Sequence, residues 1–208
     1  MNRKAHWDRI YRSTSPELVS WYQREPTLSL DLIRQALPDR SSAIIDVGGG
    51  ASTLVDGLLT AGYQRLTVLD LSGAALAAAQ NRLGEAAATV TWLEADVLTT
   101  PFGPAGFDLW HDRAVFHFLT DPSDRRRYVA QLRHAVRPDR FVLIATFAPD
   151  APPRCSGLEV ARYSPEVLQS ELGSGFRLES SQHEEHRTPG GRMQAFSYCL
   201  FRTAKPPT

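Results

Sequence analysis

A short apolar run that breaks directly into three glycines constrains this chain more than any other feature of its sequence. Residues 43–52 read AIIDVGGGAS. This pattern predicts a buried strand, a tight turn that a ligand can approach closely because side chains are absent, and a helix beginning at Ser52. The next apolar run, LTVLD, ends at Asp70, twenty residues beyond Gly50. In α/β nucleotide folds an acid at this distance from a glycine turn binds a ribose, so the two features predict a cofactor-binding domain.

Apolar runs and helix-length segments alternate through the middle of the chain. Strands are expected over residues 43–47, 65–69, 89–94, 107–111 and 141–147, with helices over 52–60, 73–83 and 121–136 between them. A helix over 26–37 should precede the first strand, and residues 1–26 should form an arm outside the sheet. After a proline-rich loop, a helix over 164–172 should precede two strands, 176–187 and 193–202, which a TPGGR turn joins. The sequence predicts an α/β fold: a doubly wound, mostly parallel seven-stranded sheet with helices on both faces and an antiparallel C-terminal hairpin.

Length and composition set the expected organisation. The 208 residues suggest one domain over 1–203, with an arm and helix (1–38), a core (40–147), a substrate-side region (148–203) and a disordered tail (204–208). With 23 basic and 23 acidic residues the net charge is zero, which argues against a nucleic-acid partner. No apolar stretch has membrane-spanning length, the amino terminus lacks the apolar core of a signal peptide, and two cysteines make no disulfide framework. A soluble, cytoplasmic protein without a membrane partner is therefore expected.

Four motifs in order give the chain a family resemblance. DVGGG at 46–50 resembles the glycine-rich first motif of the class I S-adenosylmethionine-dependent methyltransferases, and Asp70 resembles their ribose-binding acid. Asp96, in WLEADV, resembles the acid near the adenine amino group, and FDLW at 107–110 resembles the fourth-strand motif beside the methyl donor. A dehydrogenase pattern would instead need glycine at Thr53.

The resemblance implies S-adenosyl-L-methionine as cofactor. The cofactor-binding residues expected are Asp46, Gly48, Gly49, Gly50, Ser52, Asp70, Leu71, Asp96, Val97 and His111, with Trp21 and Tyr22 closing over the cofactor from the arm. Asp70 should accept hydrogen bonds from the ribose hydroxyls, its alternative role being a helix cap. The expected role of Asp46 is to bond the amides of the glycine loop.

Part of the chain is similar to a narrower subgroup, which contains protein-lysine methyltransferases and uncharacterised bacterial methyltransferases. The similar segments are HWDRIY, WYQ, WHDRAVFHFL and ELGSGFRLESS. Asp112, Ala114 and Phe116 fit the acid, small residue and aromatic residue of the lysine enzymes. His117, however, stands where those enzymes tend to carry an acid, which weakens the inference of a lysine substrate.

The candidates for catalysis follow the fourth and fifth strands, because ligands bind outside the carboxyl ends of parallel strands. His111 and His117 are candidate general bases, with a structural role as the alternative for each, and Asp112 could orient either imidazole. Arg113, Phe116, His117 and Phe147 are the candidate substrate contacts. No metal is expected, since His183 and His186 should point to opposite faces of a strand.

These observations predict a methyltransferase that acts on an oxygen, nitrogen or sulfur nucleophile of a small molecule. Two alternatives stay open: a protein (lysine) methyltransferase, and a non-catalytic protein that binds S-adenosylmethionine as a partner of another chain.

Overall fold

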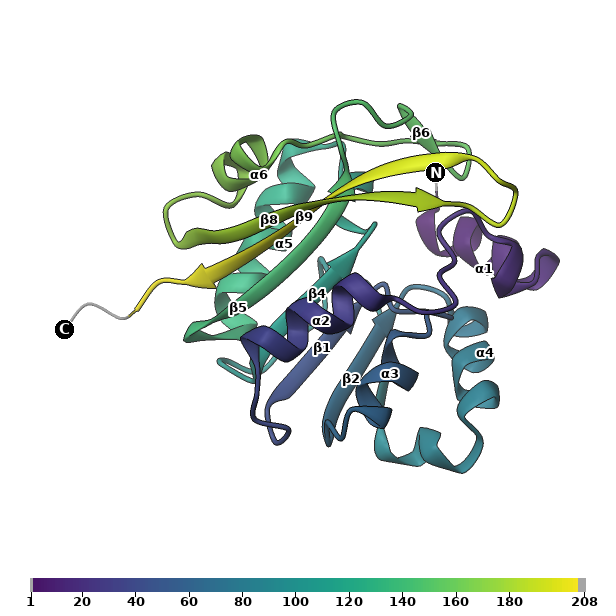
Figure 1. Ribbon diagram of the computed structural model, residues 1–208, viewed down its shortest axis with the longest axis horizontal. Helices are drawn as coiled ribbons and strands as arrows, with labels where there is room; N and C mark the ends of the chain where they lie inside the picture. Colours follow the sequence, from purple (N-terminus) through teal and green to yellow (C-terminus); the bar gives the residue numbers. More distant parts are fainter. Residues whose placement is uncertain (1, 206–208) are drawn as a thin grey trace.

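A twisted seven-stranded sheet forms the centre of the molecule in the computed structural model, which describes residues 2–205 (Figure 1). Its strands are β1 (Ala43–Val47), β2 (Arg65–Asp70), β3 (Thr91–Glu94), β4 (Phe107–Arg113), β5 (Val136–Phe147), β8 (Phe176–Arg187) and β9 (Met193–Thr203). They lie in the order β3-β2-β1-β4-β5-β9-β8. Within this sheet, over the described residues, β9 alone runs against its neighbours. The predicted fold class is confirmed.

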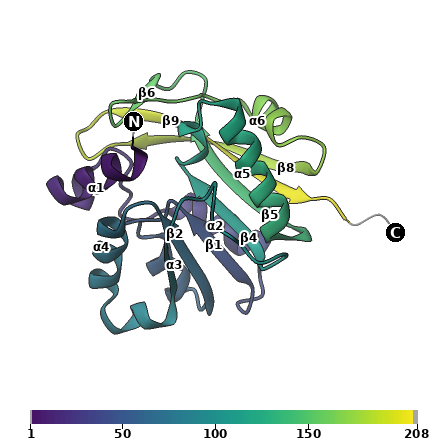
Figure 2. The ribbon, with the colours of Figure 1, turned by 180° about the vertical axis from the view of Figure 1, so that it is seen from behind.

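Helices cover both faces of this sheet. They are α1 (Arg3–Ser13), α2 (Thr27–Ala36), α3 (Leu54–Thr60), α4 (Gly73–Leu83), α5 (Pro122–Ala135) and α6 (Pro165–Leu172), with 3-10 turns at Pro16–Leu18, Gly84–Thr89 and Phe116–Phe118. A small hairpin of β6 (Arg154–Cys155) and β7 (Leu158–Glu159) follows β5. Helices α2 and α3 lie in front of the sheet in Figure 1, and α5 lies on the opposite face, in front in Figure 2. The arm helix α1 packs beside α4 in both views.

Alternation along the strands divides the interior into two apolar cores. Ile44 faces α2 and α3, where it packs with Leu32 and Leu58, whereas Ile45 packs with Leu132 of α5. The period of two in a strand sends neighbouring side chains to opposite faces, so each strand feeds both cores. The same alternation decides which face each polar residue at the strand ends can reach.

Several boundaries differ from the predicted ones. The first crossover helix begins at Leu54, because the chain continues the glycine turn with a bond from Ser52 N to Gly49 O. Residues 3–13 of the arm are helical, which the sequence reading missed. Strand β5 begins directly at the end of α5, at Val136, and not at 141. Of the tail expected to be disordered, residues 204 and 205 have no regular structure, and 206–208 lie outside the described residues.

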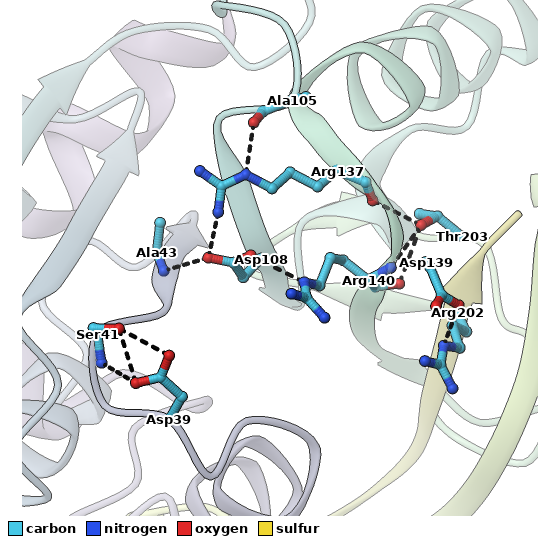
Figure 3. A network of polar contacts seen from close by, with 10 residues as sticks. All are labelled: Asp39, Ser41, Ala43, Ala105, Asp108, Arg137, Asp139, Arg140, Arg202 and Thr203. Carbon is cyan, nitrogen blue, oxygen red and sulfur yellow. Dashed lines mark hydrogen bonds and ion pairs between the residues drawn. The ribbon is translucent and has the colours of Figure 1, made fainter. Parts of the chain in front are cut away.

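Polar contacts around Asp108 of β4 stabilise the amino-terminal edge of the sheet, which here means the end at which the parallel strands begin (Figure 3). Its carboxylate accepts from Ala43 N at 2.9 Å, from Arg137 Nη1 at 2.6 Å and from Arg140 Nε at 3.1 Å. The Thr203 hydroxyl bonds the Arg137 carbonyl at 2.8 Å. These contacts join β1, β4, β5 and β9. The opposite end of the sheet, where the parallel strands finish, is called the carboxyl edge below. Within residues 2–205 no helix is both long and apolar enough to cross a bilayer.

Candidate functional site

The chain turns sharply at the carboxyl end of β1. Gly48 and Gly50 have φ of +68° and +38°, a region that favours glycine. The amides of Gly48 and Gly49 donate to the Leu69 carbonyl of β2 at 2.7 and 3.3 Å, which pins the turn against the neighbouring strand. A side chain at Gly48 would overlap Val115. The prediction that Asp46 accepts hydrogen bonds from the loop amides is wrong for Gly48 and Gly49, because both amides donate to the Leu69 carbonyl instead.

Asp46 instead forms a buried chain of hydrogen bonds with His111 and Ser29. Asp46 and His111 are register partners on β1 and β4, and His111 Nδ1 lies 2.7 Å from Asp46 Oδ1. His111 Nε2 lies 3.0 Å from Ser29 Oγ of α2. The imidazole thus bridges the carboxylate of β1 and the hydroxyl of α2. Both ring nitrogens of His111 are therefore engaged, while Asp46 Oδ2 is buried without a partner among the described residues.

Asp70 lies opposite the glycine turn. A Cβ added at Gly50 would stand 2.7 Å from Asp70 Oδ2, so only glycine leaves this approach open. Burial raises the pKa of Asp70 to about 7; the negative charges of Asp46 and Asp8 add to the shift, and the hydrogen bond from Ser72 N, at 2.8 Å, opposes it. Ser72 itself caps α4, so Asp70 is not the cap.

Two adjoining pockets open at this edge of the sheet. They share Tyr11, Trp21, Gly48 and Arg113. Of the predicted cofactor residues, the larger pocket is lined by Trp21, Gly48, Asp70, Leu71, Asp96 and Val97, and the smaller by Trp21, Tyr22, Asp46, Gly48, Gly49, Ser52 and His111. Gly50 lines neither pocket. The structure therefore places all the predicted cofactor residues except Gly50 around two adjoining pockets.

The turn after β4 sends the predicted catalytic residues in different directions. Ala114 has φ of +72°, and its amide donates to the Ala145 carbonyl at 2.9 Å, so the chain bends while it stays attached to β5. Arg113 reaches both pockets, but Asp112 faces α5, where its carboxylate accepts from Tyr128 Oη at 2.5 Å and from Val115 N at 2.8 Å. The prediction that Asp112 orients an imidazole was wrong, because its side chain lies on the other face of the sheet.

His117 is enclosed in the core, and it lines neither pocket. Its ring packs edge-on against Phe118 and Phe147, and its Nδ1 accepts from Phe147 N at 3.3 Å. Burial lowers the pKa of His117 to about 3, with a smaller contribution from the charge of Arg113. These surroundings do not suit a general base. Phe116 and Phe147, expected as substrate contacts, are likewise core residues that line neither pocket.

The sequence analysis did not predict that α1 supplies part of the wall of the larger pocket. Trp7 and Tyr11 lie four residues apart, hence on one face of the helix, and both line the larger pocket. Trp7 packs edge-to-face against Trp21 and Phe118, with ring centroids 5.6 and 5.1 Å apart. Cys155 of the β6–β7 hairpin completes this wall. The four-residue spacing of the two aromatic residues was the available signal.

Arg113 is held by contacts from three directions. Its Nε donates to Tyr198 Oη at 2.7 Å, its Nη1 to the Trp21 carbonyl at 3.0 Å and its Nη2 to Glu184 at 3.4 Å. Its guanidinium lies over the Phe196 ring, 4.2 Å from the centroid. The residue thus joins β4, the arm and the terminal hairpin where the two pockets meet. On that hairpin His183 is exposed and His186 is buried, so the two do not converge on a metal.

Comparisons with known proteins agree with this geometry. A family model described as a methyltransferase domain matches residues 44–139. An uncharacterized methyltransferase of Mycobacterium tuberculosis is 32% identical over 120 residues, which cover 56% of this chain and 56% of that protein. EEF1A lysine methyltransferase 2 of Danio rerio is 31% identical over 112 residues, covering 51% of this chain and 48% of that protein. The chain thus spans about half the length of the curated relatives it matches.

Solved structures share the fold over a longer stretch. A protein solved in a study of the conversion of a disulfide bond into a thioacetal group during echinomycin biosynthesis has a TM-score of 0.78 at 20% identity, with 99% of this chain and 94% of that chain covered. The 1,6-didemethyltoxoflavin-N1-methyltransferase of Burkholderia thailandensis, with its substrate and S-adenosylhomocysteine bound, has a TM-score of 0.67 at 21% identity, with 86% of this chain and 78% of that chain covered. Residues 44–139 thus match a methyltransferase domain, and the strand order is that of the fold which the class I S-adenosylmethionine-dependent methyltransferases share.

Proposed function

We propose that this chain transfers a methyl group from S-adenosylmethionine to a small molecule. The observation that carries the proposal is a pair of adjoining pockets that share Gly48 and Arg113. The larger pocket is lined by Asp70, the expected ribose-binding acid, and by the aromatic wall described above. Residues of α1 and of the segment after it roof this space. A roofed pocket suits an acceptor that can be enclosed, and two structural neighbours come from small-molecule chemistry.

The residues present fit the cofactor. The buried, unpartnered Oδ2 of Asp46 suits the ammonium group at the amino-acid end, because a buried carboxylate oxygen needs a donor. Asp70 would bind the ribose hydroxyls, and Asp96 and Val97 would line the adenine end. When bound, S-adenosylmethionine supplies a methyl group on a sulfonium, which is already activated for transfer.

The protein's own contribution is then to orient the acceptor and to exclude water. Alignment of two reactants can lower a barrier by about 7–11 kcal/mol. Neither predicted base is placed for proton transfer, because both nitrogens of His111 are engaged and His117 is enclosed, and Asp112, predicted to orient an imidazole, faces α5. The acceptor atom would therefore enter the pocket already unprotonated.

Transfer of label from methyl-labelled S-adenosylmethionine into a fractionated lysate tests this proposal. Label is expected in the fraction of low molecular mass, and the Asp70→Asn variant should lose it. Label confined to macromolecules would instead favour a protein methyltransferase, the activity named for the Danio rerio relative. Binding of S-adenosylmethionine without label in any fraction would favour a non-catalytic binding protein.

A further inference from the structure

We propose that the acceptor is a flat aromatic small molecule carrying an anionic oxygen or sulfur, and that Arg113 binds this anion beside the methyl donor. The inference rests on the proposed function and specifies its substrate class. It starts from the part of the larger pocket that the cofactor would leave free. That part is lined by Trp7, Tyr11, Trp21, Phe118, Cys155 and Arg113.

The aromatic wall argues for a flat acceptor. Trp7 and Trp21 are nearly perpendicular, at 87°, and Trp7 and Phe118 are inclined at 74°. Rings packed edge-to-face hold one another in place and present flat faces and edges to the adjoining space, against which another ring packs well. Trp21 Nε1 donates to Tyr11 Oη at 3.2 Å, which fixes the orientation of both side chains.

Arg113 argues for an anion. A guanidinium has five N–H groups, and three of those in Arg113 bond to Tyr198, Trp21 and Glu184 within the described residues. Arg113 lines both pockets, and its two remaining N–H groups have no hydrogen-bond partner among the described residues. Glu184 partly balances the charge, but it lines neither pocket, so an acceptor meets the guanidinium and not the carboxylate. Ionised oxygen and sulfur acceptors form the stronger, charge-assisted bonds with such a group.

The other ionisable groups near the aromatic wall do not favour a cationic acceptor. Burial raises the pKa of the Cys155 thiol to about 11 and also raises the pKa of Tyr11, so both stay neutral near pH 7. Arg3 adds a second positive charge to the pocket lining, paired with Asp124. The pocket's carboxylates, Asp70 and Asp96, belong to the proposed cofactor end. A protonated amine, such as a lysine side chain, would therefore find no carboxylate to pair with outside the proposed cofactor end of the pocket.

An anionic acceptor also agrees with the lack of a placed base. Its oxygen or sulfur forms the new bond to the methyl carbon, and the carbon–sulfonium bond breaks with its electron pair remaining on the cofactor's sulfur. No proton has to leave the acceptor, so the reaction balances without His111 or His117. Arg113 would orient the nucleophile and would remain charged throughout, because its guanidinium does not deprotonate in proteins.

Calorimetric titration of three matched probes tests the proposal without turnover. The protein is first saturated with S-adenosylhomocysteine and then titrated with 2-naphthoate, 2-naphthamide or 2-naphthylmethylammonium, which share a ring system and differ in charge. We expect naphthoate to bind about tenfold more tightly than the amide, and the ammonium probe to bind most weakly. The Arg113→Gln variant should bring naphthoate to within about twofold of the amide, and Arg113→Lys should retain part of the preference.

The controls separate this proposal from the cofactor assignment. Arg137→Gln, which removes an arginine at the far edge of the sheet, should leave the probe ranking unchanged. Cofactor affinity and thermal unfolding of each variant show whether the pocket is intact. If S-adenosylhomocysteine fails to bind, the function proposed above fails, and the same three probes are titrated into the free protein. Tightest binding of the ammonium probe, or a naphthoate preference that survives in an intact Arg113→Gln protein, would overturn the anionic acceptor.

Discussion

Asp70 illustrates a conflict between cofactor binding and the stability of the free protein. Its carboxylate is buried against the glycine turn, beside the negative charge of Asp46, and its pKa is raised to about 7. Burial of a charge without a countercharge destabilises the folded state, and a ligand that donates hydrogen bonds removes part of that cost. Asp70 thus weakens the free protein at neutral pH while it prepares a site for two hydroxyl groups.

The first prediction concerns the pH dependence of this cost. The unfolded-state pKa of an aspartate is about 3.9, so the folded protein binds the extra proton between pH 4 and about 7, and stability falls as pH rises through this window. Asp70→Asn should therefore raise the unfolding free energy of the free protein by about 3–4 kcal/mol at pH 8 and by little at pH 4. Urea unfolding at both pH values measures the difference, and an equal effect at pH 4 and pH 8 would argue against a buried, shifted carboxylate.

Strand alternation was enough to place some of the predicted residues at the carboxyl edge of the sheet, whereas it could not place the residues after the β4 turn. Asp46, Asp70 and the glycines follow directly from the ends of two apolar runs. His117 follows Ala114, where a positive φ bends the chain, so neither the strand period nor the helix period says where its ring points. That ring lies in the core because the bend turns Phe116 and His117 inward.

Among the elements, α1 is the helix whose residues Arg3, Trp7 and Tyr11 line the larger pocket. Its polar contacts include Arg3 to Asp124 at 2.5 Å, Lys4 to Glu94 at 2.6 Å, and the Ser72 hydroxyl to Asp8 at 2.7 Å. The two ion pairs involve partly exposed side chains, so solvent and salt screen them. The helix also packs Trp7 against Trp21 and Phe118. Such contacts close a pocket without fixing it permanently.

The second prediction is that α1 opens locally and that a bound ligand holds it closed. Amide exchange over residues 3–13 should be faster than in β1 and β4, should slow on addition of S-adenosylhomocysteine, and should quicken in about 1 M NaCl, where ion pairs are screened within about 3 Å. Hydrogen-exchange mass spectrometry measures all three conditions. Exchange in α1 that responds neither to ligand nor to salt would contradict its role as a cover.

The sequence reading did not find α1 because the helix carries little apolar periodicity. Only His6 of its residues is buried, and the remaining positions are mostly charged or polar. The cap at Asn2, whose side chain accepts from Ala5 N at 3.1 Å, was a usable signal. Asp121 and Ser164, by contrast, are caps that precede a proline at the first helical position, a clearer signal of a helix start.

At the scale of the whole molecule, the two edges of the sheet have different roles. The carboxyl edge holds the glycine turn, Asp70 and both pockets. The amino edge holds Asp108 (Figure 3). Burial alone would raise the pKa of its carboxyl group, but the hydrogen bonds from Ala43, Arg137 and Arg140 outweigh burial, so the pKa is lowered overall. The mostly parallel sheet and its antiparallel hairpin were predicted from the alternation of elements, whereas strand order and register come from the structure.

The third prediction separates these two edges. Asp108→Asn should lower the unfolding free energy by about 1–3 kcal/mol, because the charged bonds to two arginines are lost, yet it should leave cofactor affinity unchanged. Denaturant unfolding and calorimetry on the same preparation give both values. A variant of wild-type stability, or one whose affinity drops in the folded state, would show that the edges are not separate in this way.

The most direct test of the cofactor site is the affinity of S-adenosylmethionine for wild type, Asp70→Asn and Asp108→Asn, measured by calorimetry at pH 8. Loss of the charge-assisted bonds from two ribose hydroxyls should weaken binding to Asp70→Asn by about 1.5–3 kcal/mol, roughly ten- to a hundredfold or more. Asp108→Asn should bind like wild type. Wild-type affinity should also rise as pH increases through about 7, where Asp70 ionises. Equal affinity in all three proteins would contradict the placement of the cofactor between the glycine turn and Asp70.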